Sequence, residues 1–285
     1  MNDYIVQIDG LNKSFGKVQV LKDISFKMRI GEIYGLIGQN GAGKTTFIRT
    51  LIGLINESSG SIRIQNTKKY LGYMPQSCRF DGNATVTATL KFFSDLRKAP
   101  LENSLQLCNK LELEASKRVK FLSPGQQKKL QMIIAMTGDP DFYILDEPTA
   151  GLDPVATDEM LKYIRTLHER GKSILISSHI LENMEDICTN VAIMEKGRLI
   201  YDRQLESCLI IKTSVLTNQI VEELKIKYQA EIEEDAQSIL VRADENLVAN
   251  IIKELTQAGI SVLGVKESGI RNIVNKNIRK ETSLG

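Results

Sequence analysis

The chain has 285 residues, 42% of them hydrophobic and 25% charged, and 37 Lys and Arg against 35 Asp and Glu give a net charge of +2. This length allows one large domain or two ordinary ones. The composition is that of a globular protein and excludes a disordered, collagen-like or disulfide-rich chain. The near-neutral balance gives no support for a nucleic-acid partner.

Signals for membrane insertion and secretion are missing from the sequence. No stretch approaches about 18 consecutive apolar residues, so we expect no membrane-spanning helix. The N-terminal segment MNDYIVQIDG carries acids early and has no apolar centre, so it does not resemble a signal peptide. Wide sequence spacing predicts reduced thiols rather than a zinc or redox site for the cysteines, which are Cys78, Cys108, Cys188 and Cys208.

The first part of the chain alternates short apolar runs with turns. In chain order we predict strands at residues 4–11, 18–28 and 33–38, of which the third is the more apolar, then a helix at 47–55 and a turn at 57–61. Apolar residues then recur with helical spacing between residues 84 and 120.

The later part continues the alternation with a strand at residues 141–147, a helix at 155–170, a strand at 173–179 and a hairpin at 190–202. Lys196 and Gly197 are the predicted turn of the hairpin. Strands that alternate with helices predict a mainly parallel sheet covered by helices. After residues 203–209 the order becomes β-α-β-β-α-β, which predicts a small two-layer unit. Basic residues between 271 and 280 predict a frayed tail rather than a membrane or nucleic-acid patch.

Residues 38–45, GQNGAGKT, match the pattern G-x-x-x-x-G-K-S/T between a predicted strand and a predicted helix. The backbone N–H groups of such a loop surround phosphate oxygens, and the helix N-terminus adds positive partial charge. The pattern places Lys44 on the β- and γ-phosphates, Thr45 on Mg²⁺ and Thr46 on the α-phosphate. The residues predicted to bind the nucleotide are Gly38, Asn40, Gly41, Ala42, Gly43, Lys44, Thr45 and Thr46.

Asp146 and Glu147 end an apolar strand about a hundred residues later. Neighbouring side chains of a strand point to opposite sides. Asp146 can therefore face a Mg²⁺ ion, and Glu147 can face the attacking water as general base. Alone the pair would fit an ordinary acidic turn, but together with the phosphate loop it predicts a site of nucleotide hydrolysis.

Residues 122–126, LSPGQ, resemble the signature motif Leu-Ser-Gly-Gly-Gln of ATP-binding cassette (ABC) proteins. Other residues match the family's motifs in order. Gln76 resembles the Q-loop glutamine, Asp153 ends a segment like the D-loop, His179 resembles the switch histidine, and Phe15 resembles the aromatic residue that stacks on adenine. Residues 3–205 are thus similar to an ABC transporter ATPase subunit. Tyr4 and Tyr34 stay open as alternative stacking residues.

The resemblance implies an α/β fold, a P-loop NTPase cassette with a parallel-sheet core, an antiparallel β subdomain and a helical subdomain at about 77–137. The cassette would occupy residues 1–205, and residues 206–285 would form a small α+β accessory domain with the basic tail. It also implies ATP hydrolysis with Mg²⁺ as cofactor. Glu147, His179 and Gln76 would be catalytic, and the metal ligands would be Thr45, Gln76 and Asp146.

Family members work as dimers of identical or different nucleotide-binding subunits, with each ATP between one phosphate loop and the other subunit's signature. The resemblance therefore implies that Ser123, Gly125, Gln126 and Asp153 act across a dimer interface. Ser123 is also placed to cap a helix at 124–137. Pro124 replaces the usual glycine and has no N–H, but proline is favoured at a first helical position, so we expect that helix to form.

The resemblance also implies a separate transmembrane permease, with this chain bound through it to the cytoplasmic face of the membrane. The sequence is similar to the ATPases of bacterial drug, peptide and lipid exporters, although importers often carry a C-terminal extension too. A soluble ABC ATPase acting on DNA or ribosomes is an alternative. The balanced charge and the lack of a long coiled-coil insertion disfavour it, and no nucleic acid is expected. Residues from 209 onward can have a dimerising or regulatory role.

Overall fold

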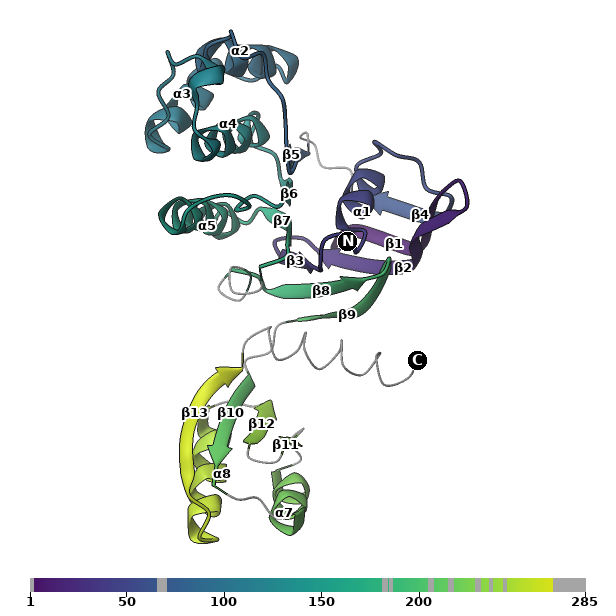
Figure 1. Ribbon diagram of the computed structural model, residues 1–285, viewed down its shortest axis with the longest axis vertical. Coiled ribbons are helices and arrows are strands. Elements are labelled where there is room, and N and C mark those ends of the chain that lie inside the picture. The colour runs from purple at the N-terminus through teal and green to yellow at the C-terminus, as the bar shows by residue number, and fades with distance from the viewer. Residues whose placement is uncertain are drawn as a thin grey trace. The chain divides into compact units, whose positions relative to one another are not determined.

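The computed structural model describes residues 3–65, 71–180, 184, 187–204, 208–214, 218–228, 232–235, 238–242 and 245–268. The chain divides into two compact units, Met1–Gln204 and Leu205–Gly285 (Figure 1). Within the described ranges no helix has both the length and the apolar character needed to cross a membrane.

The first unit is built on a six-stranded sheet with the strand order β5-β6-β7-β3-β8-β9. All neighbours are parallel except β8 and β9, which form the antiparallel hairpin predicted from the sequence. β3, β6 and β7 are buried at every residue, as is typical of parallel strands covered on both faces. The strands are β3 Ile33–Ile37, β5 Gly72–Met74, β6 Phe142–Asp146, β7 Ser173–Ser178, β8 Asn190–Glu195 and β9 Arg198–Gln204.

A three-stranded antiparallel sheet with the order β2-β1-β4 lies beside this core. Its strands are β1 Tyr4–Phe15, β2 Val18–Arg29 and β4 Ser59–Ile64. The turn predicted at 57–61 is wrong from Ser59 onward, because β4 begins there and pairs with β1. Gly60 has φ +100°, and a Cβ at this position would lie 2.5 Å from the carbonyl oxygen of Gly10. The glycine thus permits a close strand contact instead of ending the structure.

Three of the described helices of the first unit share an apolar core of their own. α2, α3 and α4 gather at one end, apart from the antiparallel sheet (Figure 1), and enclose their own apolar core around Leu90, Leu130 and Ile133. α1, predicted at 47–55, begins earlier and ends at Leu51. The described helices are α1 Lys44–Leu51, α2 Val86–Leu96, α3 Leu101–Lys110, the 3₁₀ turn η1 Val119–Phe121, α4 Pro124–Met136 and α5 Pro154–Glu169.

The second unit is a four-stranded antiparallel sheet with the order β11-β12-β10-β13. Its apolar core contains Ile211 from the sheet together with Leu224, Val248, Ile251 and Leu255 from the two helices that lie in the described part of the unit. The predicted basic tail at 271–280 lies outside the described residues. The elements are β10 Cys208–Thr213, α7 Asn218–Tyr228, β11 Ile232–Asp235, β12 Ser238–Arg242, α8 Glu245–Gln257 and β13 Val262–Ser268.

Candidate functional site

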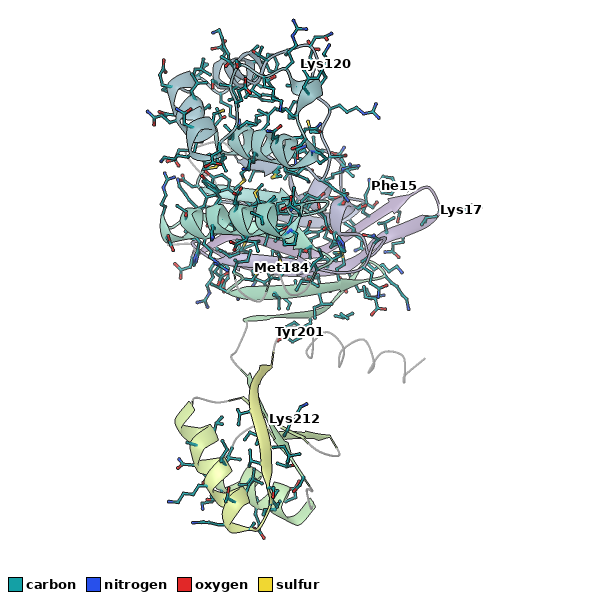
Figure 2. All side chains as sticks on the ribbon, turned by 60° about the vertical axis from the view of Figure 1, so that its left-hand side comes forward. Phe15, Lys17, Lys120, Met184, Tyr201 and Lys212 are labelled. Carbon is teal, nitrogen blue, oxygen red and sulfur yellow. The ribbon has the colours of Figure 1, made fainter. Side chains whose placement is uncertain are left out.

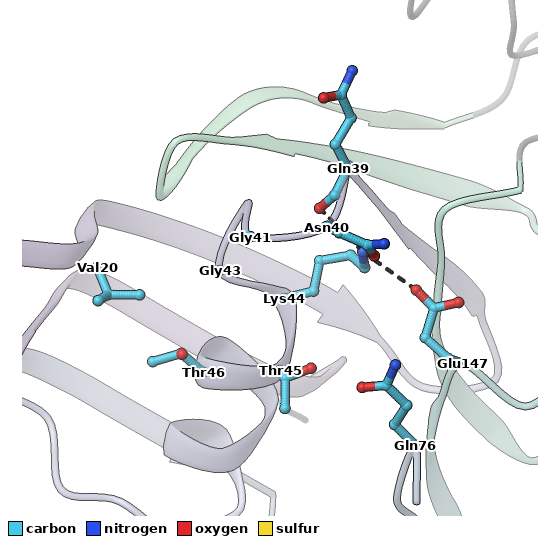
Figure 3. A pocket seen from close by; sticks show the side chains of 10 residues that line it. All are labelled: Val20, Gln39, Asn40, Gly41, Gly43, Lys44, Thr45, Thr46, Gln76 and Glu147. Carbon is cyan, nitrogen blue, oxygen red and sulfur yellow. Dashed lines mark hydrogen bonds and ion pairs between the residues drawn. The ribbon is translucent and has the colours of Figure 1, made fainter. Parts of the chain in front are cut away.

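The loop between β3 and α1 borders a pocket of about 500 Å³, a size typical of small-molecule sites (Figure 3). Gly41 and Gly43 have φ values of +84° and +110°, a backbone conformation that glycine adopts readily. They allow the loop to fold tightly before α1 begins at Lys44. The pocket is lined by Val20, Gln39, Asn40, Gly41, Gly43, Lys44, Thr45, Thr46, Gln76 and Glu147.

The turn between β8 and β9 holds this loop in place. The Gly197 N–H donates to the carbonyl oxygen of Ala42 at 2.9 Å, and the Gly197 carbonyl accepts from the Lys22 N–H at 2.8 Å. A Cβ on Gly197 would lie 2.0 Å from the carbonyl oxygen of Val20. The loop between β3 and α1 is therefore tied to the β8–β9 hairpin, and the hairpin turn is in turn tied to β2.

Lys44 supplies the positive charge of the pocket wall. The residue is 6% exposed, and its ammonium donates to the carbonyl oxygen of Gly38 at 2.7 Å. The same Nζ lies 3.3 Å from Oε1 of Glu147, the contact drawn as a dashed line in Figure 3. A buried cation beside a glycine-rich loop and a helix N-terminus fits the phosphates of a nucleotide.

Glu147 follows β6 in a strained backbone conformation. Its φ is +51°, and a non-glycine residue in this region costs about 1–3 kcal/mol unless the surroundings impose it. Here they do. The Glu147 N–H donates to the carbonyl and the hydroxyl oxygen of Ser177 at 3.2 and 3.0 Å, and its carbonyl accepts from the ammonium of Lys128 at 3.1 Å. The turn directs the carboxylate into the pocket (Figure 3).

His179 contacts the other oxygen of the Glu147 carboxylate. It follows β7, the parallel neighbour of β6, so the carboxyl ends of the two strands lie together. Nδ1 of His179 lies 2.7 Å from Oε2 of Glu147. The carboxylate of Glu147 thus lies between the ammonium of Lys44 and the imidazole of His179, while His179 keeps 42% of its side chain exposed.

Asp146 provides the oxygen that best fits a metal ion. The residue is fully buried, and its Oδ1 accepts from the hydroxyl of Ser177 at 2.6 Å, whereas Oδ2 has no hydrogen-bond partner in the described structure. The described residues contain no cluster of three His, Cys, Asp or Glu that could hold a metal alone. A carboxylate, a hydroxyl and an amide oxygen are ligands that Mg²⁺ accepts together with phosphate oxygens. Thr45 and Gln76 line the pocket, whereas Asp146 is not among its described lining residues.

The signature residues lie elsewhere. Ser123 and Gln126 form a capping box at the start of α4, where Gln126 N–H donates to Ser123 Oγ at 3.2 Å and Ser123 N–H donates to Gln126 Oε1 at 3.1 Å. Pro124 occupies the first position of that helix, as predicted. Asp153 caps α5 by accepting from Ala156 N–H at 2.9 Å. The described pocket lining includes none of Ser123, Gly125, Gln126 and Asp153.

The adenine-stacking residue stays a prediction. Phe15 lies at the end of β1 with 48% exposure, near Lys17 in Figure 2, but it does not appear in the described pocket lining. Tyr34 is excluded as an alternative, because it is 2% exposed and packs edge-on against Phe26. Tyr4 faces Lys27 and Arg29 instead.

Sequence reasoning missed Val20, Ser177 and Lys128. Val20 is an ordinary strand residue whose position beside the loop depends on the pairing of β1 with β2. Ser177 lies inside the predicted strand at 173–179, where nothing marks its hydroxyl. Lys128 lies on the predicted helix at 124–137, where the sequence gives no sign that the lysine is buried.

Comparisons with known proteins agree with this geometry. A family model described as ABC transporter matches residues 21–150. The chain is 38% identical over 207 residues to an uncharacterized ABC transporter ATP-binding protein of Methanocaldococcus jannaschii, a match covering 70% of this chain and 78% of the relative. It is 36% identical over 211 residues to Nod factor export ATP-binding protein I of Burkholderia orbicola, covering 68% and 69% of the two chains.

A solved structure described as the ATP-binding subunit of an ABC transporter superposes with a TM-score of 0.66 at 24% identity, covering 88% of this chain and 99% of that one. This likeness supports the fold. The chain belongs to the family of ABC transporter ATP-binding proteins. It is an ATPase subunit with the P-loop NTPase cassette fold, as the sequence motifs implied.

Proposed function

We propose that this ATPase powers a separate transmembrane permease that exports a drug, a peptide or a lipid. The observation that carries the export direction is the similarity to a protein named Nod factor export ATP-binding protein I, a match that covers 68% of this chain. The proposal places the chain at the cytoplasmic face of the membrane, held there by its permease.

The proposed roles of the site residues follow from their positions. Lys44 and the loop N–H groups bind the phosphates, and Glu147 accepts a proton from the attacking water. His179 orients the Glu147 carboxylate through its 2.7 Å contact. Mg²⁺, when bound, neutralises developing charge on the phosphate oxygens. Asp146, Thr45 and Gln76 are the residues that would hold it.

The active form is proposed to be a dimer of nucleotide-binding subunits. Ser123 is exposed at the start of α4, and Gly125 and Gln126 are half-buried beside it. An exposed helix N-terminus that does not line its own subunit's pocket fits a role in binding the ATP of a second subunit. Asp153, at the start of α5, would act at the same interface. Residues 206–285 are proposed as an accessory domain with a dimerising or regulatory role.

Affinity purification from membranes tests the proposal. The full chain, tagged and extracted with mild detergent, should bring down a polytopic membrane protein, and vesicles containing both should accumulate substrate in an ATP-dependent way. Recovery of ribosomes or DNA without a membrane protein would instead support the non-transport alternative. A membrane partner that moves substrate only inward would overturn the export direction and leave the ATPase assignment intact.

A further inference from the structure

Lys128 is a buried lysine that none of the motifs above includes. It lies on α4, one turn after the start of the helix, and is 8% exposed. Removing an ammonium from water is unfavourable unless the ammonium finds partners. Lys128 finds two backbone carbonyls, that of Gln76 at 2.8 Å and that of Glu147 at 3.1 Å. One side chain thus joins α4, the segment after β5 and the end of β6.

The two carbonyls belong to residues whose side chains both line the pocket (Figure 3). A bond to the backbone carbonyl does not occupy the side chain, and it fixes the backbone to which that side chain is attached. The effect matters most at Glu147, where φ is +51° and the neighbouring bonds must hold an unfavourable conformation. Ser177 holds the N–H side of this residue, and Lys128 holds the carbonyl side.

The surroundings of the ammonium are consistent with such a role. Burial lowers the pKa of Lys128, and the carboxylates of Asp146 and Glu147 act in the opposite direction. The contacts that carry the role are the two hydrogen bonds to the backbone oxygens of Gln76 and Glu147. The next residue of the helix, Lys129, has a different partner, because its ammonium pairs with the carboxylate of Glu159 at 2.8 Å.

We propose that Lys128 is a positioning residue for ATP hydrolysis, because its ammonium fixes the backbone of Gln76 and Glu147 and links their placement to the helix that begins after Ser123. The inference rests on the catalytic role proposed above for Glu147. Under this inference, the position of α4 helps to determine where the Glu147 carboxylate lies.

The test compares three variants of the full chain in steady-state ATPase assays with Mg²⁺ and ATP. Lys128→Met removes the charge and the donors but keeps the length of the side chain. A lost hydrogen bond to a charged donor should lower kcat about 10- to 100-fold while KM for ATP changes less than about threefold. Lys128→Arg should restore most of kcat, because the guanidinium can still donate to both carbonyls. Lys129→Met is the matched control and should keep wild-type kcat.

Unchanged kcat in Lys128→Met, or an equal loss in Lys129→Met, would overturn the inference. So would a loss that Lys128→Arg does not rescue while all variants melt at the wild-type temperature. If Lys128→Met does not fold, Lys128→Gln replaces it under the same criteria. Glu147→Gln is assayed in parallel: if it keeps wild-type turnover, the proposed role of Glu147 fails, whereas its inactivity beside an active Lys128→Met refutes only the role of Lys128.

Discussion

The ammonium of Lys44 on the phosphate-binding loop lies 3.3 Å from the carboxylate of Glu147 at the end of β6. Both side chains are nearly buried, so each group partly compensates the desolvated charge of the other. ATP phosphates in this pocket would compete with Glu147 for Lys44. Nucleotide binding would therefore release the carboxylate of Glu147 from Lys44.

Glu147→Gln should bind ATP but lose hydrolysis. The amide cannot accept the proton of water, and general-base catalysis contributes about 10²- to 10⁴-fold, so kcat should fall by that factor. ATP affinity should stay the same or rise, because Lys44 no longer pairs with an anion. The protein should accumulate as an ATP-bound dimer, which size-exclusion chromatography with Mg²⁺ and ATP detects. Glu112→Gln, on an exposed turn, is the control. Normal turnover in Glu147→Gln would remove Glu147 as the base.

His179→Ala should reduce kcat without abolishing ATP binding. The imidazole contacts Glu147 at 2.7 Å, and a hydrogen bond to a charged group contributes about 1.5–3 kcal/mol, which corresponds to roughly a 10- to 100-fold effect on rate. Residue 168 is the chain's other histidine, so His168→Ala is a matched control that should keep wild-type activity. Equal activities of the two variants would argue against any contribution of His179 to turnover.

The parts of the site that depend on local sequence could be predicted. The loop at 38–45 and the acidic strand end at Asp146 and Glu147 follow from residue types in a fixed order, and so does the turn at Lys196 and Gly197. Each of these features is encoded in a few neighbouring residues, and the structure has the loop and the turn where they were expected, whereas β6 ends at Asp146, one residue earlier than predicted.

The contacts that hold these parts together could not be predicted, because they use backbone groups that every residue has. The bond from Gly197 N–H to Ala42 and the bonds from Lys128 to Gln76 and Glu147 join segments distant in sequence. The sequence predicted Glu147 as the simple end of a strand. Its left-handed turn is imposed by Ser177 and Lys128, which the local pattern does not contain.

Gly197→Ala should weaken ATP binding. The added Cβ would lie 2.0 Å from the carbonyl oxygen of Val20, so the turn must move and its bond to Ala42 must lengthen. A shift of the phosphate-binding loop should raise the Kd for ATP about tenfold, equivalent to about 1.4 kcal/mol. Titration with a fluorescent ATP analogue measures this change.

Gly171→Ala is the matched control for that experiment. Gly171 has φ +76°, close to the +84° of Gly197, but a Cβ there would meet nothing within 4 Å. Both variants therefore carry similar backbone strain, and only Gly197→Ala carries the clash beside the loop. Equal ATP affinity in the two variants would contradict the proposed role of the β8–β9 turn.

Arg97→Ala should destabilise the helical part of the first unit. The guanidinium, at the end of α2, donates to the carbonyl oxygens of Ile134, Ala135 and Thr137 at 3.1, 3.2 and 2.8 Å, and so satisfies the C-terminal end of α4. Burial lowers the pKa of Arg97, as expected of a cation withdrawn from water. Loss of these bonds should lower the free energy of unfolding by about 2 kcal/mol.

Urea denaturation followed by circular dichroism measures this loss against two further variants. Arg97→Lys should recover only part of the stability, because the lysine ammonium lies on a shorter side chain than Nη1, the nitrogen of Arg97 that donates to all three carbonyls. Lys91→Ala removes an exposed pair with Asp95 on the same helix, in which both side chains are more than 60% exposed, at 63% and 66%. Such a pair contributes less than about 1 kcal/mol, so this variant should unfold close to the wild-type midpoint. If Arg97→Ala unfolds there too, the carbonyl contacts of Arg97 do not stabilise the fold.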